Sequence, residues 1–425
     1  MPWTREVRRG DRDDEPAGDR TVRRSGRRGA GTSTLLLFVA VGALLAGTTV
    51  ATTTTFGDRT SSPAALSTTS APSQPAPAEA EGPAASTSAV TTTPSVDPCT
   101  AKIASLPLRA RLAQLLVVGV DPSGPADALA AVQGEQVGGI FIGGDHTGLL
   151  SAGALAPVHA AAALPLTVAV DDEGGRVQRL DAIAGPMPSA RSMAADLSPA
   201  EVRAVARQRG QAMRERGVTT DLAPVVDTSA QPDRTVIGDR SFSPDPDTAL
   251  GYALAFAEGL HDAGVTPVLK HFPGHGNTTG DSHLGAVRSP PLDALRGADL
   301  VPYRHITRFG EVVVMLGHVD VPGLTGGRPA TLSPEAYTLL RGEFGFTGPA
   351  MTDDLGAMRA VTDLMGLPDA VTQALVAGAD IALWSSGGRL PEVLDHLERA
   401  VAAGTLTPAR VDEALRRVLA AKQVC

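Results

Sequence analysis

Lysine is almost absent from this chain. Its 37 basic residues include only three lysines, Lys102, Lys270 and Lys422, so arginine supplies nearly all of the positive charge. A lysine here departs from the general pattern, and Lys270 stands in a histidine-rich stretch, which indicates a specific role. Positive charge is also in deficit overall, since the formal net charge is −9 at pH 7. This balance argues against nucleic acid as a partner.

The apolar run near the N-terminus lacks the full length of an ordinary membrane span. Residues 35–47, LLLFVAVGALLAG, match a signal-peptide core of about 7–15 residues, and extended to Ala51 the run could nearly cross a bilayer. The arginines before it place residues 1–33 in the cytoplasm and the rest of the chain outside. No cysteine stands directly after the run, which argues against a lipid anchor. We expect residues 34–51 to be either a cleaved signal peptide or an uncleaved membrane anchor.

Large apolar side chains are scarce in residues 52–98, where Thr, Ser, Ala and Pro dominate. This composition cannot bury enough apolar surface to offset chain entropy, so the segment is predicted to be a disordered tether. The folded part is then expected at residues 99–425, as a single domain of the size of a large barrel. This organisation predicts a secreted or membrane-tethered protein.

The expected domain repeats a short apolar run followed by a helical pattern rich in Ala, Leu and Arg. Continuous apolar runs are typical of strands buried on both faces of a parallel sheet. The runs are residues 115–120, 138–143, 166–171, 219–224, 266–272, 312–318, 349–354 and 381–386. Eight such units predict an α/β fold of the (β/α)8 TIM-barrel type. An open doubly wound sheet is the alternative, although no glycine-rich phosphate turn follows the first run.

Polar residues stand where several of these predicted strands end. In a TIM barrel the chemistry lies at the C-terminal ends of the strands, so we expect a site at that mouth. The residues at these ends are Asp171, Asp221, Lys270, His271, His318, Asp353 and Asp354.

Metal-assisted hydrolysis is one chemistry that these residues could support. His271, His275, Asp281, His283 and His318 are acceptable ligand types. However, Lys270 would place an ammonium group beside the cation, and no H-x-H or H-E-x-x-H pattern is present. We therefore expect no metal.

Glycoside cleavage is the other chemistry, and it needs a carboxylate on one face of the sugar and a proton donor on the other. Asp353, at a predicted strand end, could supply the carboxylate. His283 could supply the proton, and Asp281, two residues before it, could hold the imidazole and stabilise its charged form.

Several motifs occur in an order that resembles family 3 glycoside hydrolases of the β-N-acetylhexosaminidase type. They are LAQLLVVG, AVDDEGGRVQRL, DLAPVVD, VIGDRSF, KHFPGHGNTTGDSH, PATLS and MTDDLGAM, within residues 103–419. The resemblance implies that Asp353 is the nucleophile, that His283 is the acid/base and that Asp281 is its partner. It also implies that sugar hydroxyls are held by Asp171, Arg179, Arg240, Lys270 and His271. His318 and Asp354 are expected to line or support the site, and the resemblance implies no metal or organic cofactor.

The resemblance also predicts the activity and the partners. We expect a retaining exo-β-N-acetylglucosaminidase that acts on N-acetylglucosaminides, with muropeptides from peptidoglycan as its natural substrates, and that works as a monomer. A β-glucosidase or a glycoside phosphorylase is the alternative within enzymes. A non-catalytic wall-binding barrel is the alternative of another class, and the presence of Asp353, Asp281 and His283 argues against it.

The chain has two cysteines, which bracket the expected domain at its extreme ends. Barrel closure brings the first and last units together, so the two ends can lie close. In an exported protein such a pair favours a disulfide, which we predict between Cys99 and Cys425.

Overall fold

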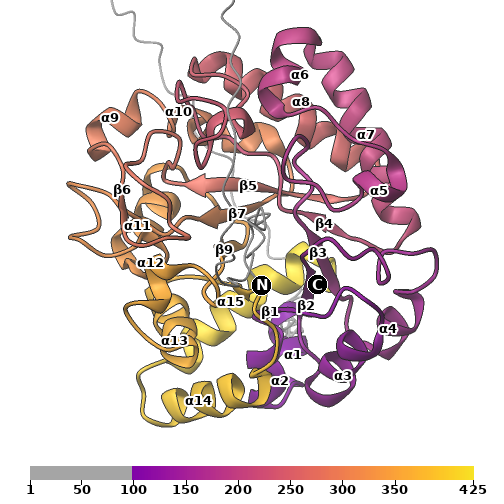
Figure 1. The fold of residues 1–425 in the computed structure, drawn as a ribbon. Helices are drawn as coiled ribbons and strands as arrows, with labels where there is room; N and C mark the ends of the chain where they lie inside the picture. The colour runs from indigo at the N-terminus through magenta and orange to yellow at the C-terminus, as the bar shows by residue number, and fades with distance from the viewer. Residues whose placement is uncertain (1–97) are drawn as a thin grey trace, which may run out of the picture. The chain divides into compact units, whose positions relative to one another are not determined.

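Eight parallel strands form a barrel in the computed structural model, which describes residues 98–425 (Figure 1). The predicted cytoplasmic segment, signal or anchor, and tether lie outside the described residues. The barrel strands are β1 Leu116–Gly119, β2 Gly139–Ile142, β3 Thr167–Val170, β4 Thr220–Asp221, β5 Thr266–Phe272, β7 Val313–Leu316, β9 Ala350–Thr352 and β10 Ala382–Trp384. Each strand lies inside one of the eight predicted runs.

The strand order confirms the barrel and excludes the doubly wound sheet. Neighbouring strands follow the order β10-β1-β2-β3-β4-β5-β7-β9, so the first strand pairs with the last. A parallel bridge between Met351 and Ile381 then joins β9 to β10 and completes the ring. An open sheet would leave two strand edges unpaired.

The helices surround the ring of strands, so each strand is covered on both faces (Figure 1). This arrangement explains the continuous apolar runs, because the barrel interior and the layer under the helices both exclude water. The helices are α1 Pro98–Ala104, α2 Leu108–Ala113, α3 Ala126–Glu135, α4 Ala156–Ala161, α5 Asp181–Ala184, α6 Ala190–Asp196, α7 Pro199–Glu215, α8 Pro246–Asp262, α9 Leu292–Arg296, α10 Val301–Arg304, α11 Pro334–Thr338, α12 Arg359–Thr362, α13 Leu367–Ala377, α14 Leu390–Ala402 and α15 Pro408–Ala421.

Local sequence accounts for where the two longest helices begin and end. A capping box starts α7, in which Ser198 and Glu201 satisfy each other's backbone N–H groups. The side chain of Asp245 accepts the N–H of Thr248 at the start of α8. After α8 the chain turns at Gly264, whose φ of 74° is a conformation that glycine adopts without strain.

Short elements complete the domain. A two-stranded parallel sheet pairs β6 Val287–Arg288 with β8 Val319–Asp320, next in sequence to the loops that follow β5 and β7. Four single-turn elements are η1 Gly238–Arg240, η2 Ile306–Phe309, η3 Ala330–Leu332 and η4 Leu339–Glu343.

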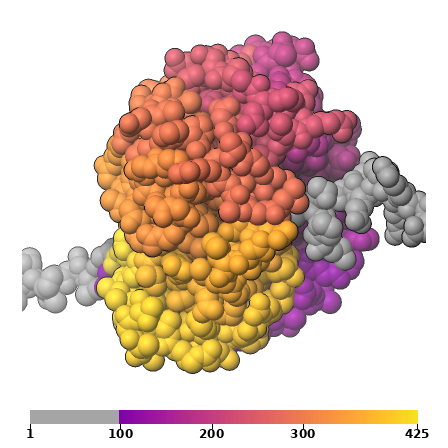
Figure 2. Space-filling view, turned by 60° about the vertical axis from the view of Figure 1, so that its left-hand side comes forward, coloured from indigo at the N-terminus to yellow at the C-terminus, as the bar shows by residue number. Residues whose placement is uncertain are grey.

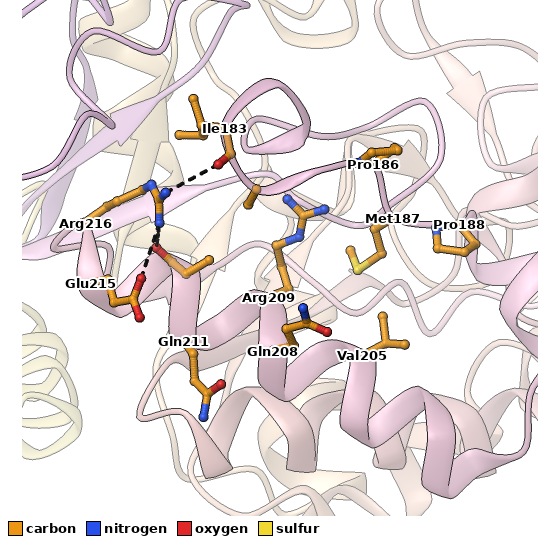
Figure 3. A pocket seen from close by; sticks show the side chains of 12 residues that line it. Ile183, Pro186, Met187, Pro188, Val205, Gln208, Arg209, Gln211, Glu215 and Arg216 are labelled. Atoms are coloured by element: carbon orange, nitrogen blue, oxygen red, sulfur yellow. Dashed lines mark hydrogen bonds and ion pairs between the residues drawn. The ribbon is translucent and has the colours of Figure 1, made fainter.

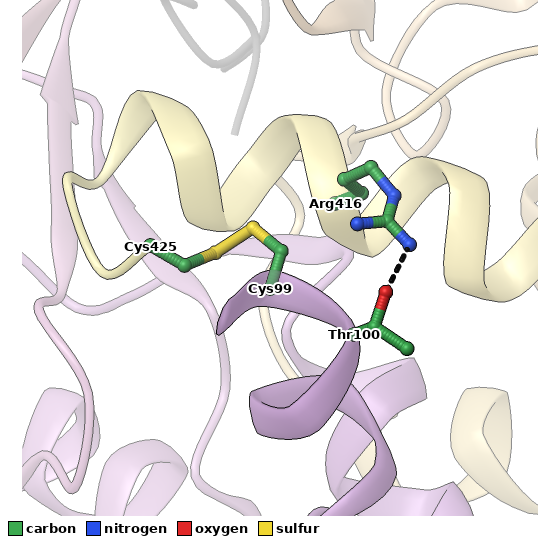
Figure 4. The surroundings of a disulfide bond; sticks show 4 residues. All are labelled: Cys99, Thr100, Arg416 and Cys425. Carbon is green, nitrogen blue, oxygen red and sulfur yellow. Dashed lines mark hydrogen bonds between the residues drawn. A yellow bond between two sulfur atoms is a disulfide. The ribbon is translucent and has the colours of Figure 1, made fainter. Parts of the chain in front are cut away.

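A disulfide joins the two ends of the domain, as predicted. Cys99 on α1 is bonded to Cys425 after α15, with their Cα atoms 5.0 Å apart across a sequence separation of 326 (Figure 4). Arg416 donates a hydrogen bond to the Thr100 hydroxyl at 3.0 Å beside the bond. The space-filling view also places the first described segments, in indigo, next to the last, in yellow (Figure 2). Closure of the barrel therefore brings these ends together.

Reduction of this disulfide is expected to lower stability without changing the fold. A bond across a long loop typically contributes about 2–4 kcal/mol, and the contact of α1 with α15 limits the gain because these ends are already packed. A loss of 1 kcal/mol in the free energy of unfolding lowers the Tm by about 2 °C or more. We therefore expect the Tm of the oxidised protein to fall by several degrees on reduction.

Thermal unfolding with and without reductant measures this effect. The variant Cys99→Ser/Cys425→Ser is the matched control, since its Tm should not respond to reductant. Two thiols open to alkylation in the native, oxidised protein would contradict the prediction.

Candidate active site

The C-terminal ends of the barrel strands open into a cavity of about 610 Å3. Its walls come from the ends of β3, β5, β9 and β10 and from the loops that follow them. Because all strands of a parallel barrel end on one face, residues far apart in sequence meet there. The predicted site residues that line it are Asp171, Arg240, Lys270, His271, Asp281, His283, Asp353 and Asp354.

Asp353 follows β9 directly and is positioned by the barrel backbone. Its N–H donates to the carbonyl of Leu316 at 3.0 Å, which continues the pairing of β7 with β9. Its Oδ1 accepts the N–H of Asp354 at 2.9 Å. Burial opposes the charge of Asp353, but the neighbouring His318 and His271 outweigh burial, so the pKa of this carboxyl is lowered. A buried carboxylate that stays ionised beside a cavity can act as a nucleophile.

The adjacent carboxylate, that of Asp354, already accepts hydrogen bonds from other groups of the protein. Its Oδ1 accepts the N–H of Gly356 at 2.8 Å and that of Ser385 at 3.0 Å, and the Ser385 hydroxyl donates to its other oxygen. Asp354 thus ties the end of β9 to the end of β10. Asp353 is the member of the pair that remains available to a substrate.

His283 and Asp281 form a hydrogen-bonded pair on the loop after β5. The Nδ1 of His283 lies 2.7 Å from Asp281 Oδ1, which also accepts the His283 backbone N–H at 2.9 Å. Burial raises the pKa of the Asp281 carboxyl, but these hydrogen bonds outweigh burial and lower it. An ionised Asp281 therefore holds the half-buried imidazole by Nδ1 and leaves Nε2 for a substrate.

His275 braces the loop that carries His283. It is buried, with Nδ1 3.0 Å from the Thr278 hydroxyl and Nε2 3.3 Å from the Ser282 hydroxyl. Burial lowers the pKa of this imidazole to about 4, so the ring is neutral near pH 7. These contacts give His275 a structural role at the edge of the cavity.

The turn at the start of this loop packs too closely for any side chain. A Cβ on Gly276 would lie 1.8 Å from the carbonyl oxygen of Thr228, and one on Gly274 would lie 2.5 Å from the Cβ of Asp299. The Oδ1 of Asp299 accepts the N–H groups of Thr228 and Gly276 at 3.1 and 3.2 Å. The loops after β4 and β5 are therefore fastened together beneath the cavity.

At the floor of the cavity one buried carboxylate, that of Glu173, pairs with two cations, Lys270 and Arg240. Lys270 Nζ lies 2.5 Å from Asp171 Oδ1 and 2.6 Å from Glu173 Oε1. Arg240 binds the same Glu173 with two hydrogen bonds of 2.7 Å. Burial opposes ionisation of Glu173, but Arg240 and Lys270 outweigh it and lower the pKa of the carboxyl. This network fixes the donor groups that the sequence assigned to sugar hydroxyls.

Glu173 is a site residue that the sequence interpretation missed. It stands beside a glycine turn, and its carboxylate orients Lys270 and Arg240. Its position two residues after the strand-end Asp171 was the available indication.

Asp227 is a second residue that the sequence analysis did not single out. Its Oδ2 lies 2.7 Å from Nδ1 of His271, and its Oδ1 accepts the backbone N–H of His275 at 2.8 Å. With Nδ1–H donated to Asp227, the Nε2 of His271 turns toward Arg240 Nη2, 3.5 Å away. The only indication in the sequence was its place at the end of the DLAPVVD motif.

Known proteins match the domain over most of its length. The sequence pattern of the glycosyl hydrolase family 3 N terminal domain matches residues 107–421. The chain belongs to glycosyl hydrolase family 3. The assignment made from the motifs is therefore confirmed, and the chain is a glycoside hydrolase.

Similar family 3 proteins are known from several bacteria. The beta-hexosaminidase LpqI of Mycobacterium tuberculosis is 53% identical over 321 residues, which cover 74% of this chain and 82% of the relative. A solved family 3 hydrolase from Mycobacterium smegmatis is 53% identical, with a TM-score of 0.73 over 75% of this chain and 98% of its own. The solved beta-N-acetylhexosaminidase from Beutenbergia cavernae is 30% identical, with a TM-score of 0.70 over 75% and 99%. These structures confirm the barrel fold.

Asp221 and His318 were predicted to lie at the mouth of the barrel, and neither side chain reaches it. Asp221 is fully buried and accepts the N–H of Asp172 at 3.0 Å, and burial together with Asp172 raises the pKa of its carboxyl well above the ordinary value. His318 lies behind the cavity, 2.8 Å from the carbonyl of Asp354 and 2.7 Å from the Thr331 hydroxyl. Neither side chain lines the cavity. Only Oδ1 of Asp221 accepts a hydrogen bond, since its buried Oδ2 has no partner within the described residues. Both ring nitrogens of His318 are bonded to groups of the wall, so His318 supports the wall instead of lining it.

Arg179 is also placed differently from the other predicted sugar-binding residues. Its Nη1 donates to the carbonyl of Gln178 at 2.7 Å, and its backbone N–H donates to Asp172 Oδ1 at 3.0 Å. It is not among the residues that line the cavity, whereas Arg176 of the same motif is. A contact between Arg179 and sugar stays a prediction.

A second cavity of about 460 Å3 lies between α7 and the segment of residues 183–188 (Figure 3). Arg216 there is bonded to the carbonyls of Ala212 and Ile183, and Glu215 is the one acidic residue of the lining. With Glu215 as its one carboxylate and no histidine, this cavity lacks the pair of groups, a nucleophile and a separate proton donor, that glycoside cleavage requires.

Neither a metal cluster nor a membrane-spanning helix is found in residues 98–425. No group of three or more His, Cys, Asp or Glu side chains is arranged there to hold a metal ion. None of the helices in this part of the chain has the length and apolar character needed to cross a membrane.

Replacing Glu173 by glutamine is expected to impair sugar binding in this family 3 enzyme. The amide keeps the shape but removes the charge that holds Lys270 and Arg240, so both cations lose their fixed positions. Misplaced binding groups typically cost about 10²-fold in rate, which we expect in kcat/KM.

Steady-state kinetics and thermal unfolding measure this change. The matched control is Glu215→Gln, since Glu215 is 76% exposed and lies away from the barrel mouth. An unchanged kcat/KM in Glu173→Gln would show that the network does not position substrate.

Proposed function

We propose that this chain is a retaining exo-β-N-acetylglucosaminidase that removes terminal β-linked N-acetylglucosamine through a glycosyl-enzyme intermediate. The observation that carries the proposal is a buried, ionised Asp353 in the same cavity as the His283–Asp281 pair. Relatives support the choice of sugar, since one is named a beta-N-acetylhexosaminidase and a Paenibacillus relative, 31% identical, is named a beta-N-acetylglucosaminidase.

In the first step Asp353 attacks the anomeric carbon from the α face of the sugar. The bond from that carbon to the leaving oxygen breaks, and protonated His283 gives its Nε2 proton to this oxygen. A covalent ester between Asp353 and the sugar results, and His283 is left neutral.

In the second step water replaces the carboxylate. Neutral His283 takes a proton from the water, whose oxygen attacks the anomeric carbon from the β face. The ester bond breaks, Asp353 returns as a carboxylate and His283 is again protonated. Two inversions leave the configuration unchanged.

The floor of the cavity is suited to the terminal sugar. Lys270 is 2% exposed and His271 is 5% exposed, and both lie deep in the cavity together with Asp171 and Arg240. Their fixed donors and acceptors match a ring of hydroxyl groups. Burial at the floor favours a chain end over an internal sugar, which supports exo action.

We also place this enzyme outside the cytoplasm, with fragments of peptidoglycan as its substrates. The arginine-flanked apolar run at residues 35–47 supports export or membrane tethering. The Cys99–Cys425 disulfide supports an oxidising compartment, where such bonds persist. A cell-wall substrate would be accessible to the enzyme in that location.

Phosphorolysis is a second candidate because the proton donor is a histidine. A neutral or cationic imidazole repels an incoming phosphate less than a carboxylate would. Phosphate would then replace water in the second step and release a sugar phosphate.

The test compares nitrophenyl N-acetylglucosaminide, glucoside and N-acetylgalactosaminide, each with and without phosphate. We expect hydrolysis of the first, with release of free sugar at a rate that phosphate does not change. Preference for the glucoside would replace the proposed specificity, and formation of sugar phosphate would establish phosphorolysis. No turnover of any substrate would favour a binding protein.

A further inference from the structure

Two arginines hold the segment of residues 229–238, which follows β4 and borders the cavity. Arg191 binds one side of it through the carbonyls of Ser229, Gln231 and Gly238 and the carboxylate of Asp233, at 2.7–2.9 Å. Arg176 binds the other side through the carbonyls of Thr235, Val236 and Ile237, at 2.6, 3.0 and 3.1 Å. The backbone of this segment is therefore fixed without help from its own arginine, Arg234.

Arg234 is exposed, lines the cavity and has no recorded partner. Across residues 98–425 the structure records neither an ion pair nor a hydrogen bond for its guanidinium. The other lining cations each have a carboxylate: Arg176 pairs with Asp239, Arg240 with Glu173, and Lys270 with Asp171 and Glu173. A guanidinium at a cavity edge, unused by the fold, is suited to an anion that arrives with the substrate.

The position of Arg234 assigns it to the leaving-group side of the cavity. Its segment is tied to the acid/base loop, because Gln231 Nε2 donates to the carbonyl of Thr278 at 3.2 Å. His283 on that loop must face the leaving oxygen, and Leu284, 71% exposed, follows it and also lines the cavity. The terminal sugar occupies the buried floor, so an exposed residue at the rim meets whatever the sugar is attached to.

We propose that Arg234 selects substrates whose leaving group carries a carboxylate, and that Leu284 contacts the apolar part of that group. This inference rests on the proposed function, since it assigns the leaving-group side of the same cavity. A planar guanidinium can bind a carboxylate with two parallel hydrogen bonds. The carboxylate belongs either to a muramic acid ring or to a peptide attached to it.

The experiment measures kcat/KM on three disaccharide substrates that share a terminal N-acetylglucosamine. One is neutral, with a second N-acetylglucosamine; one carries N-acetylmuramic acid; and one carries N-acetylmuramic acid with its peptide. In Arg234→Ala we expect the loss on the two acidic substrates to exceed the loss on the neutral one by about fivefold, the scale of an exposed ion pair. Arg234→Lys should keep part of the preference, and Arg234→Glu should reverse it.

The control variant is Arg207→Ala, which removes the same charge from an exposed position on α7 outside the cavity. It should leave the ratio of acidic to neutral substrate unchanged. A selective loss on both acidic substrates assigns the contact to the muramic acid carboxylate. A loss confined to the peptide-bearing substrate assigns it to the peptide.

Equal losses on all three substrates in Arg234→Ala, or an unchanged ratio in Arg234→Glu, would overturn the inference while leaving the proposed function intact. Failure of the unaltered enzyme to cleave any N-acetylglucosaminide would overturn the proposed function itself.

Discussion

Replacing Asp353 by asparagine is expected to abolish cleavage of disaccharide and nitrophenyl substrates alike. The amide cannot form the ester, so no leaving group, however good, allows the first step to proceed. We expect kcat/KM to fall by a factor on the order of 10⁴ or more, the scale seen when a catalytic nucleophile is removed. The fold should persist, because the backbone of Asp353 keeps its bond to Leu316.

Trapping the intermediate tests this assignment directly. A 5-fluoro analogue of the substrate should label Asp353, as found by peptide mapping. In Asp353→Gly, azide should act in place of the missing carboxylate and give an α-glycosyl azide, because it attacks from the face that Asp353 occupied. Label on Asp354, or continued turnover without label, would contradict the assignment.

The pH dependence of the unaltered enzyme follows from the environment of Asp353. Its pKa lies below the ordinary value of 3.8, because His318, His271 and the amide of Asp354 outweigh burial. A lowered pKa means that the carboxylate stays ionised as the pH falls. Loss of kcat/KM through protonation of Asp353 is therefore expected only below about pH 4. An acid limb that lies near pH 6 and persists in His283→Ala would contradict this expectation.

Replacing His283 by alanine is expected to affect substrates according to their leaving groups. A sugar alkoxide leaves poorly without a proton, whereas a nitrophenolate leaves without help. We expect kcat/KM to fall by about 10²–10⁴-fold on a disaccharide and by much less on the nitrophenyl substrate. The second step should also slow, because no group then activates water.

Kinetics with added azide separates this role from simple packing of the loop. Azide needs no base, so it should accelerate the second step in His283→Ala and give a β-glycosyl azide, opposite in configuration to the product expected from Asp353→Gly. Asp281→Asn should behave as a milder form of the same change, since it keeps the imidazole with weaker support. An equal loss on both substrates without an effect of azide would remove His283 from the mechanism.

The sequence alone was sufficient to predict the barrel. Most of its eight strands are continuous apolar runs, because both faces of the sheet are covered, and such runs can be recognised without knowing their neighbours. The place of Asp353 at a strand end also followed from local order, since Asp353 stands at the end of the seventh run, residues 349–354. The pairing of Asp281 with His283 is local as well, because they stand two positions apart.

Contacts across long stretches of sequence could not be obtained in this way. Glu173 meets Arg240 and Lys270 across 67 and 97 residues, and Asp227 meets His271 across 44. Closure of the barrel brings these pairs together. From the sequence alone, a carboxylate beside a glycine turn has the same appearance whether it caps the turn or pairs with cations at the floor of the cavity.

The direction in which each strand-end side chain points is the other property that only the tertiary structure decided. Asp171 and Asp221 both stand at strand ends, yet Asp171 meets Lys270 at the cavity floor while Asp221 is buried against the Asp172 backbone. The sequence determined which residues arrive at the mouth of the barrel. The packing of the strand ends determined which of them face the cavity, because a side chain that is fully buried, such as Asp221, does not reach it, whereas Asp171 lines it.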